Sequence, residues 1–526
     1  MLTDVISSYL LDELNLFKPN LIYNGGGHFL LLAPNNSLNI KKLEEIEKVI
    51  NIKLFNKYSG KLQFIIGNVE EKAETIITSL NNVYKRLTDE MANKKKQKSY
   101  STLDLLFSNT IDFKKVDEFQ EILNKEEENI GKLLPRSNYL IEIESDKVVN
   151  INVSDIEVID FRDFNRSILL SDDKTIVNNV EKILSNITPS EINQINIYKI
   201  NDTDFIDESS LNKYKFPVSN LFKFVGNYTP LRDKTNFEIM SFEELAKLKS
   251  ENYPILGIAR MDLDSLGAVF SYGLKEESVD ERKYTISRIA YLSRELVHFF
   301  CGHLNKIAED NDVYIAYSGG DDVFAVGSWI NIIEFIQQVK NEFAEFACGN
   351  PNLTISCGIT FTKPSFPIAN SAKLAGAEEK RAKEEDEIYK SRVSCFSTVV
   401  KWDELENLVE FGKGLNAIVS DKELGSSVKI PRSFIHSILA MTKECFDAKG
   451  KIKMNKVFKV SARLHYLFGR RKITDKKIED YDNKKDDKIK DFKIELAKSF
   501  LKSENPGIYY KHFNIPASYV IYKTRN

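Results

Sequence analysis

The chain has 526 residues, 42% hydrophobic and 29% charged, enough apolar material for several buried cores. Lysine and arginine total 74 and aspartate and glutamate total 77, which excludes a protein drawn to nucleic acid by its overall charge. The five cysteines form no Cys-x-x-Cys pair, and no stretch approaches eighteen uncharged apolar residues. The composition therefore predicts a reduced, cytoplasmic protein without zinc, disulfides or a membrane partner.

The first ninety residues predict helices and strands around a glycine turn. Gly25, Gly26 and Gly27 separate two apolar runs, and glycine accepts the positive φ that a tight hairpin turn needs. The expected elements are a helix at residues 3–14, a hairpin at 21–32, an amphipathic helix at 40–55 and a strand at 62–66.

The next stretch, up to about residue 221, is polar and uneven. It contains three consecutive lysines at 94–96, an acidic run at 126–128 and a strand-like piece at 139–143. These features predict a small α+β connecting domain whose charge runs are solvated faces.

The most informative pattern lies in the following 110 residues. From Pro254 we expect a strand, a helix at 286–309, a hairpin, a helix at 329–348 and a strand at 353–362. This order is the split βαβ pattern, in which the first strand and the hairpin can pair side by side.

Carboxylates stand at two strand ends of this pattern. Gly319 and Gly320 form the hairpin turn and are followed by Asp321 and Asp322, while the first strand ends in Asp262-Leu263-Asp264. Alternation places Asp262 and Asp264 on one face, and the topology brings the turn next to them. Carboxylates of this kind bind Mg²⁺ (or Mn²⁺) together with substrate phosphates, which predicts a nucleoside triphosphate substrate and a two-metal site. The alternatives are a solvated turn and an ordinary strand end.

The two glycine turns indicate an internal repeat. The first copy has no aspartate pair at its turn and no upstream strand, so it cannot be a complete catalytic unit. We interpret it as a degenerate partner that binds nucleotide through backbone N–H groups of Gly25, Gly26 and Gly27; a plain structural hairpin is the alternative.

Beyond residue 401 the pattern is helical. Residues 449–477 contain eleven lysines or arginines against one acidic residue, interleaved with Phe458, Tyr466 and Phe468. Such a segment could bind phosphates and stack on unpaired bases. An amphipathic helix with a basic exposed side and an aromatic core side fits equally well.

These motifs resemble a known family. Asp262 to Gly267, Tyr317 to Asp322, Cys348-Gly349-Asn350-Pro351 and the first glycine turn closely resemble the large subunit of type III-A CRISPR effector (Csm) complexes. Residues 224–230 resemble the segment leading into that family's second palm domain, and 519–525 its closing helix. In that family two palm domains, related to diguanylate cyclases, face each other and join ATP into cyclic oligoadenylates when the complex captures target RNA.

The resemblance implies an α+β fold with two ferredoxin-like (βαββαβ) palm domains, the first lacking its first strand. The expected boundaries are 1–92 for the degenerate palm, 93–225 for the connecting domain, 226–400 for the catalytic palm and 401–526 for a helical domain. The implied partners are guide crRNA, target RNA and the small helical and backbone subunits of the complex.

The resemblance also implies roles for single residues. Asp262 and Asp321 would be metal ligands, with the Leu263 carbonyl as a further candidate, and Asp264 and Asp322 would complete the acidic site. Ser318, Gly319 and Gly320 would bind nucleotide. Lys383 matches by its spacing the lysine of the cyclases that contacts the triphosphate, although Gly376 replaces the usual aspartate; a solvated surface lysine is the alternative.

Two departures from the family limit the transfer. None of the six histidines is followed by aspartate, so we expect no HD-type DNase activity. The region matching the family's zinc site, 113–135, has no cysteine, which predicts no zinc. The absent strand of the first palm would leave an open sheet edge, and we hypothesise that a separate chain supplies it together with an HD domain.

The predicted chemistry is attack of a nucleotide 3′ oxygen on the α-phosphate of ATP, with release of pyrophosphate. Three alternatives remain at this stage: a diguanylate-type cyclase, a template-directed polymerase and a scaffold subunit without activity.

Overall fold

The protein is a mixed α+β structure. The computed structural model describes the chain except residues 59, 61, 79, 97–129, 146–157, 172–191, 205–216, 236, 250–252, 271–284, 386–389, 421–431, 447–452, 454, 457, 461, 464, 465, 467–510 and 526. The chain forms two compact units. Unit 1 comprises Met1–Thr229, Ser265–Lys306 and Tyr317–Asp322, and unit 2 comprises Pro230–Asp264, Ile307–Ala316 and Val323–Asn526. Among the described residues, no helix is long and apolar enough to cross a bilayer.

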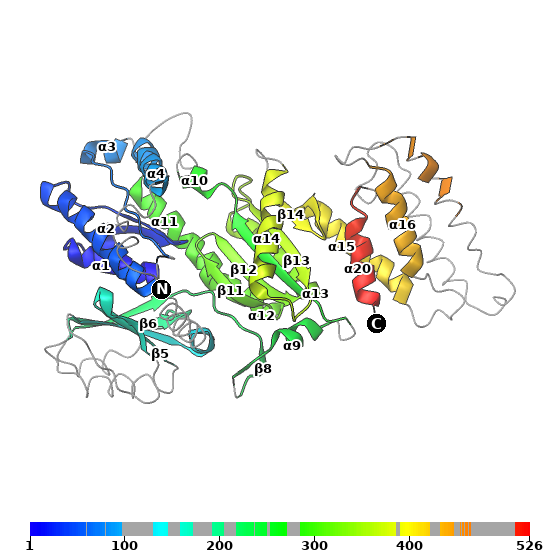
Figure 1. Cartoon of the computed structure of the whole chain (residues 1–526), viewed down its shortest axis with the longest axis horizontal. Helices are drawn as coiled ribbons and strands as arrows, with labels where there is room; N and C mark the ends of the chain where they lie inside the picture. Colours follow the sequence, from blue (N-terminus) through cyan, green and yellow to red (C-terminus); the bar gives the residue numbers. More distant parts are fainter. Residues whose placement is uncertain are drawn as a thin grey trace, which may run out of the picture. The chain divides into compact units, whose positions relative to one another are not determined.

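The helices and hairpin predicted at the start of unit 1 are present. They are α1 (Leu2–Glu13), η1 (Lys18–Asn20), β1 (Leu21–Gly25), β2 (His28–Leu31), α2 (Ser37–Tyr58), α3 (Ala73–Thr78) and α4 (Leu80–Lys96). The apolar faces of α1 and α2 enclose a core that includes Val5, Leu10, Ile50 and Leu54, each at most 2% exposed. Figure 1 shows α1 and α2 beside the hairpin.

The strand predicted at 62–66 does not form. β1 and β2 make a two-stranded sheet, and the segment 62–66 lies outside any strand ladder. The Asn51 side chain of α2 takes the place of a strand partner: Phe64 N–H donates to Asn51 Oδ1 (2.8 Å), and Asn51 Nδ2 donates to the Phe64 carbonyl (2.9 Å). A side-chain amide satisfies one peptide unit but cannot continue a ladder, so this apolar β-like sequence does not become a strand.

A five-stranded sheet follows in unit 1, in the order β4-β5-β3-β6-β7. Its strands are β3 (Tyr139–Glu144), β4 (Val158–Phe161), β5 (Arg166–Ser171), β6 (Gln194–Ile200) and β7 (Val218–Lys223), with the 3₁₀ turns η3 (Leu134–Arg136) and η4 (Arg162–Phe164). The strand expected at 139–143 is therefore confirmed as β3, the central strand. It pairs antiparallel with both β5 and β6.

Most of unit 2 is built on a six-stranded sheet in the order β11-β12-β10-β13-β14-β15, whose hairpin tip at Tyr317–Asp322 is counted with unit 1. The strands are β10 (Leu256–Leu263), β11 (Tyr314–Gly319), β12 (Asp322–Ser328), β13 (Ile355–Thr362), β14 (Arg392–Cys395) and β15 (Thr398–Lys401). Three of the predicted elements thus occur as expected: the first strand, the hairpin and the strand at 353–362. The sequence did not predict β14 and β15, which extend the sheet beyond β13. A short ribbon of β8 (Leu231–Asp233) and β9 (Glu238–Ile239) leads into α9 (Phe242–Lys247).

Helices α13 (Trp329–Phe346) and α14 (Ile368–Glu384) cover opposite faces of this sheet (Figure 1). A β-carbon placed on Gly257 of β10 would lie 2.9 Å from Ile332 of α13. Gly358 of β13 pairs with Arg260, which lies on the opposite face of the sheet from Gly257. A β-carbon on Gly358 would lie 2.0 Å from Glu379 N of α14. Glycine at 358 is therefore what lets α14 lie directly on the strand.

The helix predicted at 286–309 is interrupted once. After the single turn α10 (Leu266–Ala268) the chain forms α11 (Ile286–Val297), the π-helical turn η8 (His298–His303) and α12 (Leu304–Asp310). The Thr285 side chain caps α11 by accepting from the Arg288 N–H. A π-helical turn inside a helix often marks a functional site.

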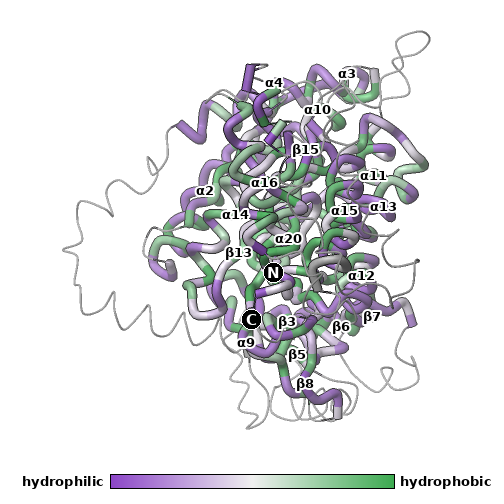
Figure 2. Tube along the Cα trace, turned by 90° about the vertical axis from the view of Figure 1, so that its right-hand side faces the viewer, coloured by the Kyte–Doolittle hydropathy of each residue, from purple (hydrophilic) through white to green (hydrophobic). Residues whose placement is uncertain are grey.

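The end of unit 2 is helical, as predicted, with α15 (Trp402–Ser420), α16 (Arg432–Glu444) and α20 (Asn514–Thr524) around a core of their own. The closing helix expected near 519–525 is α20, and its Tyr519 and Tyr522 rings pack edge-on against the buried Trp329. In Figure 2 hydrophobic residues colour α20 and β13 green, whereas α4 is mostly purple. The four domain boundaries taken from the sequence stay a prediction.

Candidate functional site

The turn between β11 and β12 holds two carboxylates at the tip of a tight hairpin. Gly320 has φ +67°, and Asp321 N–H donates to the Gly319 carbonyl at 2.8 Å. Glycine is required at 320 because an L side chain rarely adopts this conformation. A β-carbon on Gly319 would lie 2.7 Å from the Tyr317 hydroxyl. Both glycines are therefore needed for the conformation of the hairpin tip. Asp322 is the first residue of β12.

The strand leading into this turn is anchored to the π-helical turn η8. Ser318 Oγ donates to the Phe300 carbonyl, and Cys301 Sγ contacts the Ser318 carbonyl at 3.7 Å. Phe300 is fully buried, so the acceptor is part of a rigid core. Widening the helix at η8 turns a carbonyl outward, and Ser318 uses it. The hydroxyl of Ser318, which the sequence predicted to contact nucleotide, is thus used in a hydrogen bond that holds the strand to η8.

The two glycine turns lie against each other inside unit 1. A β-carbon on Gly25 would be 3.7 Å from Gly320 Cα, and one on Gly26 would be 3.3 Å from Asp321 Oδ1. Gly26 and Gly27 have φ of +58° and +77°. The repeat found in the sequence is therefore a spatial pair as well: a turn without acidic residues faces a turn that carries them.

Two aromatic side chains of the first hairpin lie in the electrostatic reach of Asp321. Burial is the main cause that raises the pKa of the Tyr23 hydroxyl, with Tyr84 and the Asp321 carboxylate adding to it. Desolvation and the Lys95 ammonium lower the pKa of His28, against the opposing effect of Asp321. A neutral imidazole and a protonated phenol are the forms expected at neutral pH. The sequence analysis missed both residues because only the fold brings them to the turn.

Asp262, near the end of β10 in unit 2, is paired with Lys383 of α14. Lys383 Nζ contacts the Asp262 carboxylate and donates to Glu379 Oε1 at 2.8 Å. Burial alone would lower the pKa of Lys383, but these two carboxylates raise it. The side chains of Lys383 and Asp262 are only 22% and 23% exposed. The alternative that Lys383 is a solvated surface lysine is therefore wrong.

Gly376 explains how α14 reaches the strand. A β-carbon at this position would lie 3.0 Å from Arg260 Nη1, and Arg260 Nε lies 3.6 Å from Glu379 Oε2. The glycine that replaces the usual aspartate thus makes room for a second cation beside Glu379. Glu379 itself precedes Lys383 by four residues on one helix face, a spacing that the sequence could have identified.

Asp264 has a different setting from Asp262. It is 3% exposed, and its carboxylate accepts from Thr354 Oγ1 (2.8 Å), Ser356 Oγ (2.7 Å) and the Ser391 N–H (3.0 Å). β10 ends at Leu263, so strand alternation does not extend to Asp264. Its bonds tie the end of β10 to β13 and to the segment before β14. This geometry favours a positioning carboxylate over a metal ligand.

Metal binding can be tested against these donors. Asp262 presents a partly exposed carboxylate, and hard oxygen donors suit Mg²⁺. In the part of the chain that the structure describes, no group of three or more His, Cys, Asp and Glu side chains is gathered into a metal site. Leu263 is 1% exposed, so only its backbone carbonyl could contribute. The donor types suit the cation, but the described side chains are not gathered around a shared point, and Lys383 supplies the positive charge beside Asp262.

The basic segment near the C-terminus is described only in part, and Phe468 lies outside the described residues. Phe458 and Tyr466 are 71% and 64% exposed, and Arg463 pairs with Glu444 at 3.3 Å. These exposures contradict the alternative in which Phe458 and Tyr466 form the core side of an amphipathic helix.

Two family models match this chain. Residues 255–392 match the second palm domain of Cas10/Cmr2, and residues 1–111 match domain B of the Csm1 subunit. The first match contains Asp262, both turn carboxylates and Lys383, and the second contains the first glycine turn.

Curated relatives cover most of the chain. A protein of Streptococcus thermophilus named CRISPR system single-strand-specific deoxyribonuclease Cas10/Csm1 (subtype III-A) is 27% identical over 522 residues, which are 96% of this chain and 61% of the relative. A protein of the same name from Methanocaldococcus jannaschii is 26% identical over 76% of this chain and 55% of its own length. The chain thus spans somewhat more than half the length of these relatives.

Solved structures share the fold. The apo Csm1–Csm4 cassette superposes with a TM-score of 0.67 at 18% identity, covering 99% of this chain and 65% of that one. Csm1 of T. onnurineus has a TM-score of 0.65 at 20% identity, covering 99% and 64%. The two family matches and these relatives together show that the chain is similar, along most of its length, to the Cas10/Csm1 large subunits of type III-A CRISPR systems.

Proposed function

We propose that this chain is the ATP-converting large subunit of a type III-A effector complex, and that it makes cyclic oligoadenylates when the complex binds target RNA. The observation that carries the proposal is the contact between the turns, Gly25 against Gly320 and Gly26 against Asp321, with carboxylates on one side only. Structures with the same fold are complexes of a Csm1–Csm4 cassette with one ATP, with pppApA and with cA4. Those ligands belong to relatives, and they support the same substrate class here.

The proposed architecture is two palm domains of βαββαβ type. The strand order β11-β12-β10-β13 with intervening helices supports the second palm. The α1–β1–β2–α2 arrangement supports a first palm in which residues 62–66 form no strand and the first strand is absent. A separate chain that supplies this strand and an HD domain stays a hypothesis. The absence of HD-type DNase activity likewise stays a prediction, which rests on the lack of any His-Asp pair in the sequence.

In the proposed reaction the 3′ hydroxyl oxygen of one nucleotide attacks the α-phosphorus of another. A new phosphorus–oxygen bond forms, the bond from the α-phosphorus to the oxygen bridging to the β-phosphate breaks, pyrophosphate leaves, and the hydroxyl proton is released to solvent. Positioning and electrostatics supply most of the rate in such transfers. No histidine or cysteine nucleophile is needed.

The residues of the chain divide this work. Asp262 and Asp321, with the Leu263 carbonyl, would hold Mg²⁺ or Mn²⁺, and Asp322 would complete the acidic site. A bound divalent cation supplies Lewis-acid stabilisation of the charge on the phosphates. The backbone of both glycine turns approaches the nucleotides closely because it has no side chains. Lys383 is placed to neutralise the triphosphate once it leaves Asp262, and Asp264 fixes the strand end.

The proposed macromolecular partners are guide crRNA, target RNA and other subunits of the effector complex. The exposed aromatic rings of Phe458 and Tyr466, next to exposed lysines, support contact with single-stranded RNA at the C-terminal domain. A subunit of the Csm4 kind is the expected neighbour, since that subunit accompanies the relatives of known structure.

The test is to incubate the full chain, alone and in a reconstituted guide-RNA complex, with labelled ATP, Mg²⁺ and complementary target RNA. Mass spectrometry should find cyclic oligoadenylates that depend on target RNA and vanish in an Asp321→Ala, Asp322→Ala variant. The same assay with GTP separates this function from a diguanylate-type cyclase. An intact, RNA-bound complex that makes no nucleotide product would show that the subunit is a scaffold.

A further inference from the structure

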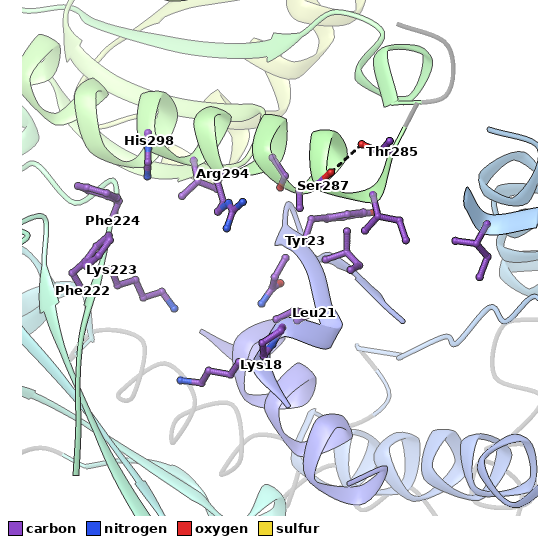
Figure 3. Close-up of a pocket in the computed structure, with 18 of the residues that line it drawn as sticks. Lys18, Leu21, Tyr23, Phe222, Lys223, Phe224, Thr285, Ser287, Arg294 and His298 are labelled. Carbon is purple, nitrogen blue, oxygen red and sulfur yellow. Dashed lines mark hydrogen bonds between the residues drawn. The ribbon is translucent and has the colours of Figure 1, made fainter. Parts of the chain in front are cut away.

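Unit 1 contains a cavity of about 1030 Å³ beside the first hairpin (Figure 3). Its walls come from β1, the helix α11, the end of β7 and the short elements η1 and α3. None of the acidic residues proposed for catalysis lines it, and neither glycine turn does. Ligand sites commonly have volumes of roughly 300–1,000 Å³, so the space suits a nucleotide-sized molecule.

Three cations line this cavity from three different elements: Lys18 of η1, Lys223 of β7 and Arg294 of α11. Figure 3 shows their nitrogen atoms directed toward the open space. Among the described lining residues there is no aspartate or glutamate. The charged groups facing the space are therefore all of one sign, an arrangement that recognises an anion.

The cations differ in how firmly they are held. Lys223 Nζ donates to Asp4 Oδ2 at 2.7 Å, and Lys18 Nζ donates to the Tyr198 hydroxyl at 3.1 Å. The Arg294 carbonyl accepts from the His298 N–H within the helix, whereas its guanidinium has no hydrogen bond or ion pair with any described residue. Two ammonium groups are thus fixed in place, while a guanidinium with five N–H donors remains available for a phosphate.

Aromatic side chains line the same space. Phe222 belongs to strand β7 and is 42% exposed. Its ring packs edge-on to Phe224, with ring centroids 5.7 Å apart. Phe224 in turn packs against His298 at 5.1 Å. Tyr23, at the other wall, stacks on Phe270 at 5.8 Å. A supported, exposed ring next to cations is the kind of surface on which a nucleobase stacks.

We infer that this cavity is a second nucleotide site, which binds a nucleoside phosphate with its base on Phe222 and its phosphate at Lys18 and Arg294. The site is separate from the turn carboxylates and needs no divalent cation, because Lys18 and Arg294 provide positive charge beyond Lys223, which is paired with Asp4. Its recognition chemistry stands without the proposed function. Only the choice of an adenine nucleotide as probe rests on that function.

The experiment measures binding of labelled ATP to the full chain in EDTA by isothermal titration calorimetry and equilibrium dialysis. We expect binding without Mg²⁺, unchanged in the Asp321→Ala, Asp322→Ala variant and about tenfold weaker in Arg294→Gln, since a hydrogen bond to a charged group is lost. Phe222→Ala should weaken ATP and adenosine binding but not binding of inorganic triphosphate. Arg288→Gln is the matched control, because Arg288 is an exposed arginine of the same helix that does not line the cavity.

Three outcomes would overturn the inference: no ATP bound in EDTA, equal binding by the Arg294→Gln and Arg288→Gln variants, or loss of all binding in the turn variant. The last would place nucleotide only at the turns. Thermal melting of each variant identifies a folding defect, and Arg294→Lys, which keeps the charge, should retain part of the affinity. Failure of ATP conversion with binding intact would count against the proposed function alone.

Discussion

Gly26 faces Asp321: a β-carbon on Gly26 would lie 3.3 Å from Asp321 Oδ1. Two residues almost 300 positions apart thus form the contact between a turn without acidic residues and a turn with them. Gly27, its neighbour, also has a positive φ, but a β-carbon there would meet nothing within 4 Å. The pair therefore offers a substitution and its control within one turn.

Gly26→Ala should reduce nucleotide conversion by about tenfold more than Gly27→Ala. Both substitutions place an L side chain at positive φ and cost about 1–2 kcal/mol of stability, but only the first presses on the catalytic carboxylate. A tenfold rate effect corresponds to about 1.4 kcal/mol in the barrier. Product formation and melting temperature are measured for both variants. Equal activity at equal stability would mean that the turn contact has no part in catalysis.

Lys383→Met should destabilise unit 2 by about 1–3 kcal/mol, because it leaves Asp262 and Glu379 without their shared cation. Lys380→Met is the control, since Lys380 is 74% exposed on the same helix and pairs with Glu384 at 3.5 Å. Surface pairs of that kind contribute little.

The same Lys383→Met variant separates two roles of the lysine. If Lys383 balances the charge of Asp262 before the cation arrives, Mn²⁺ should bind more tightly to the variant in the absence of nucleotide, and ATP should bind more weakly. Electron paramagnetic resonance of free Mn²⁺ measures the first effect. Unchanged Mn²⁺ affinity would contradict the competition between lysine and metal.

Asp264→Asn should lower the melting temperature more than Asp262→Asn. The amide keeps one acceptor oxygen but turns an NH₂ group toward hydroxyl or backbone donors, which costs about 1–3 kcal/mol in a buried site. Asp262 is partly exposed, so solvent can replace part of what an amide at this position would lose. A variant of Asp264 that melts normally but loses Mn²⁺ binding would instead identify Asp264 as a ligand.

His512 should make the C-terminal helical region sensitive to mild acid. Burial and Lys511 lower the pKa of this imidazole to about 4, against the effect of Glu404, and the side chain is 7% exposed. The unfolded chain takes up the proton near pH 6.5, whereas the folded chain does so only near pH 4. Stability is therefore full above pH 6.5 and falls as pH drops toward 4, by up to about 3 kcal/mol.

The measurement is the melting temperature between pH 4 and pH 7. His512→Leu should flatten this dependence, whereas His436→Gln, which changes an exposed histidine of α16, should keep it. The same slope in all three proteins would assign the pH dependence to other groups.

Local pattern predicted much of this fold. The helices near 3–14, 40–55 and 329–348 follow from apolar periodicity, and both hairpins follow from glycine turns between β-forming runs. The segment 62–66 shows where this reasoning fails: its residues suit a strand, but a strand needs a neighbour to share its backbone hydrogen bonds. The chain offers it the Asn51 amide instead.

The sequence by itself determined which residues could carry the chemistry. These are the two glycine turns, the carboxylates at strand ends, and Lys383, whose spacing matches that of the cyclase lysine. Only the tertiary structure decided how they are arranged. It placed Gly26 against Asp321, paired Lys383 with Asp262 and buried Asp264 among hydroxyl donors. The physical reason is that turn shape and periodicity depend on neighbours along the chain, whereas charge pairing and burial depend on packing between distant segments.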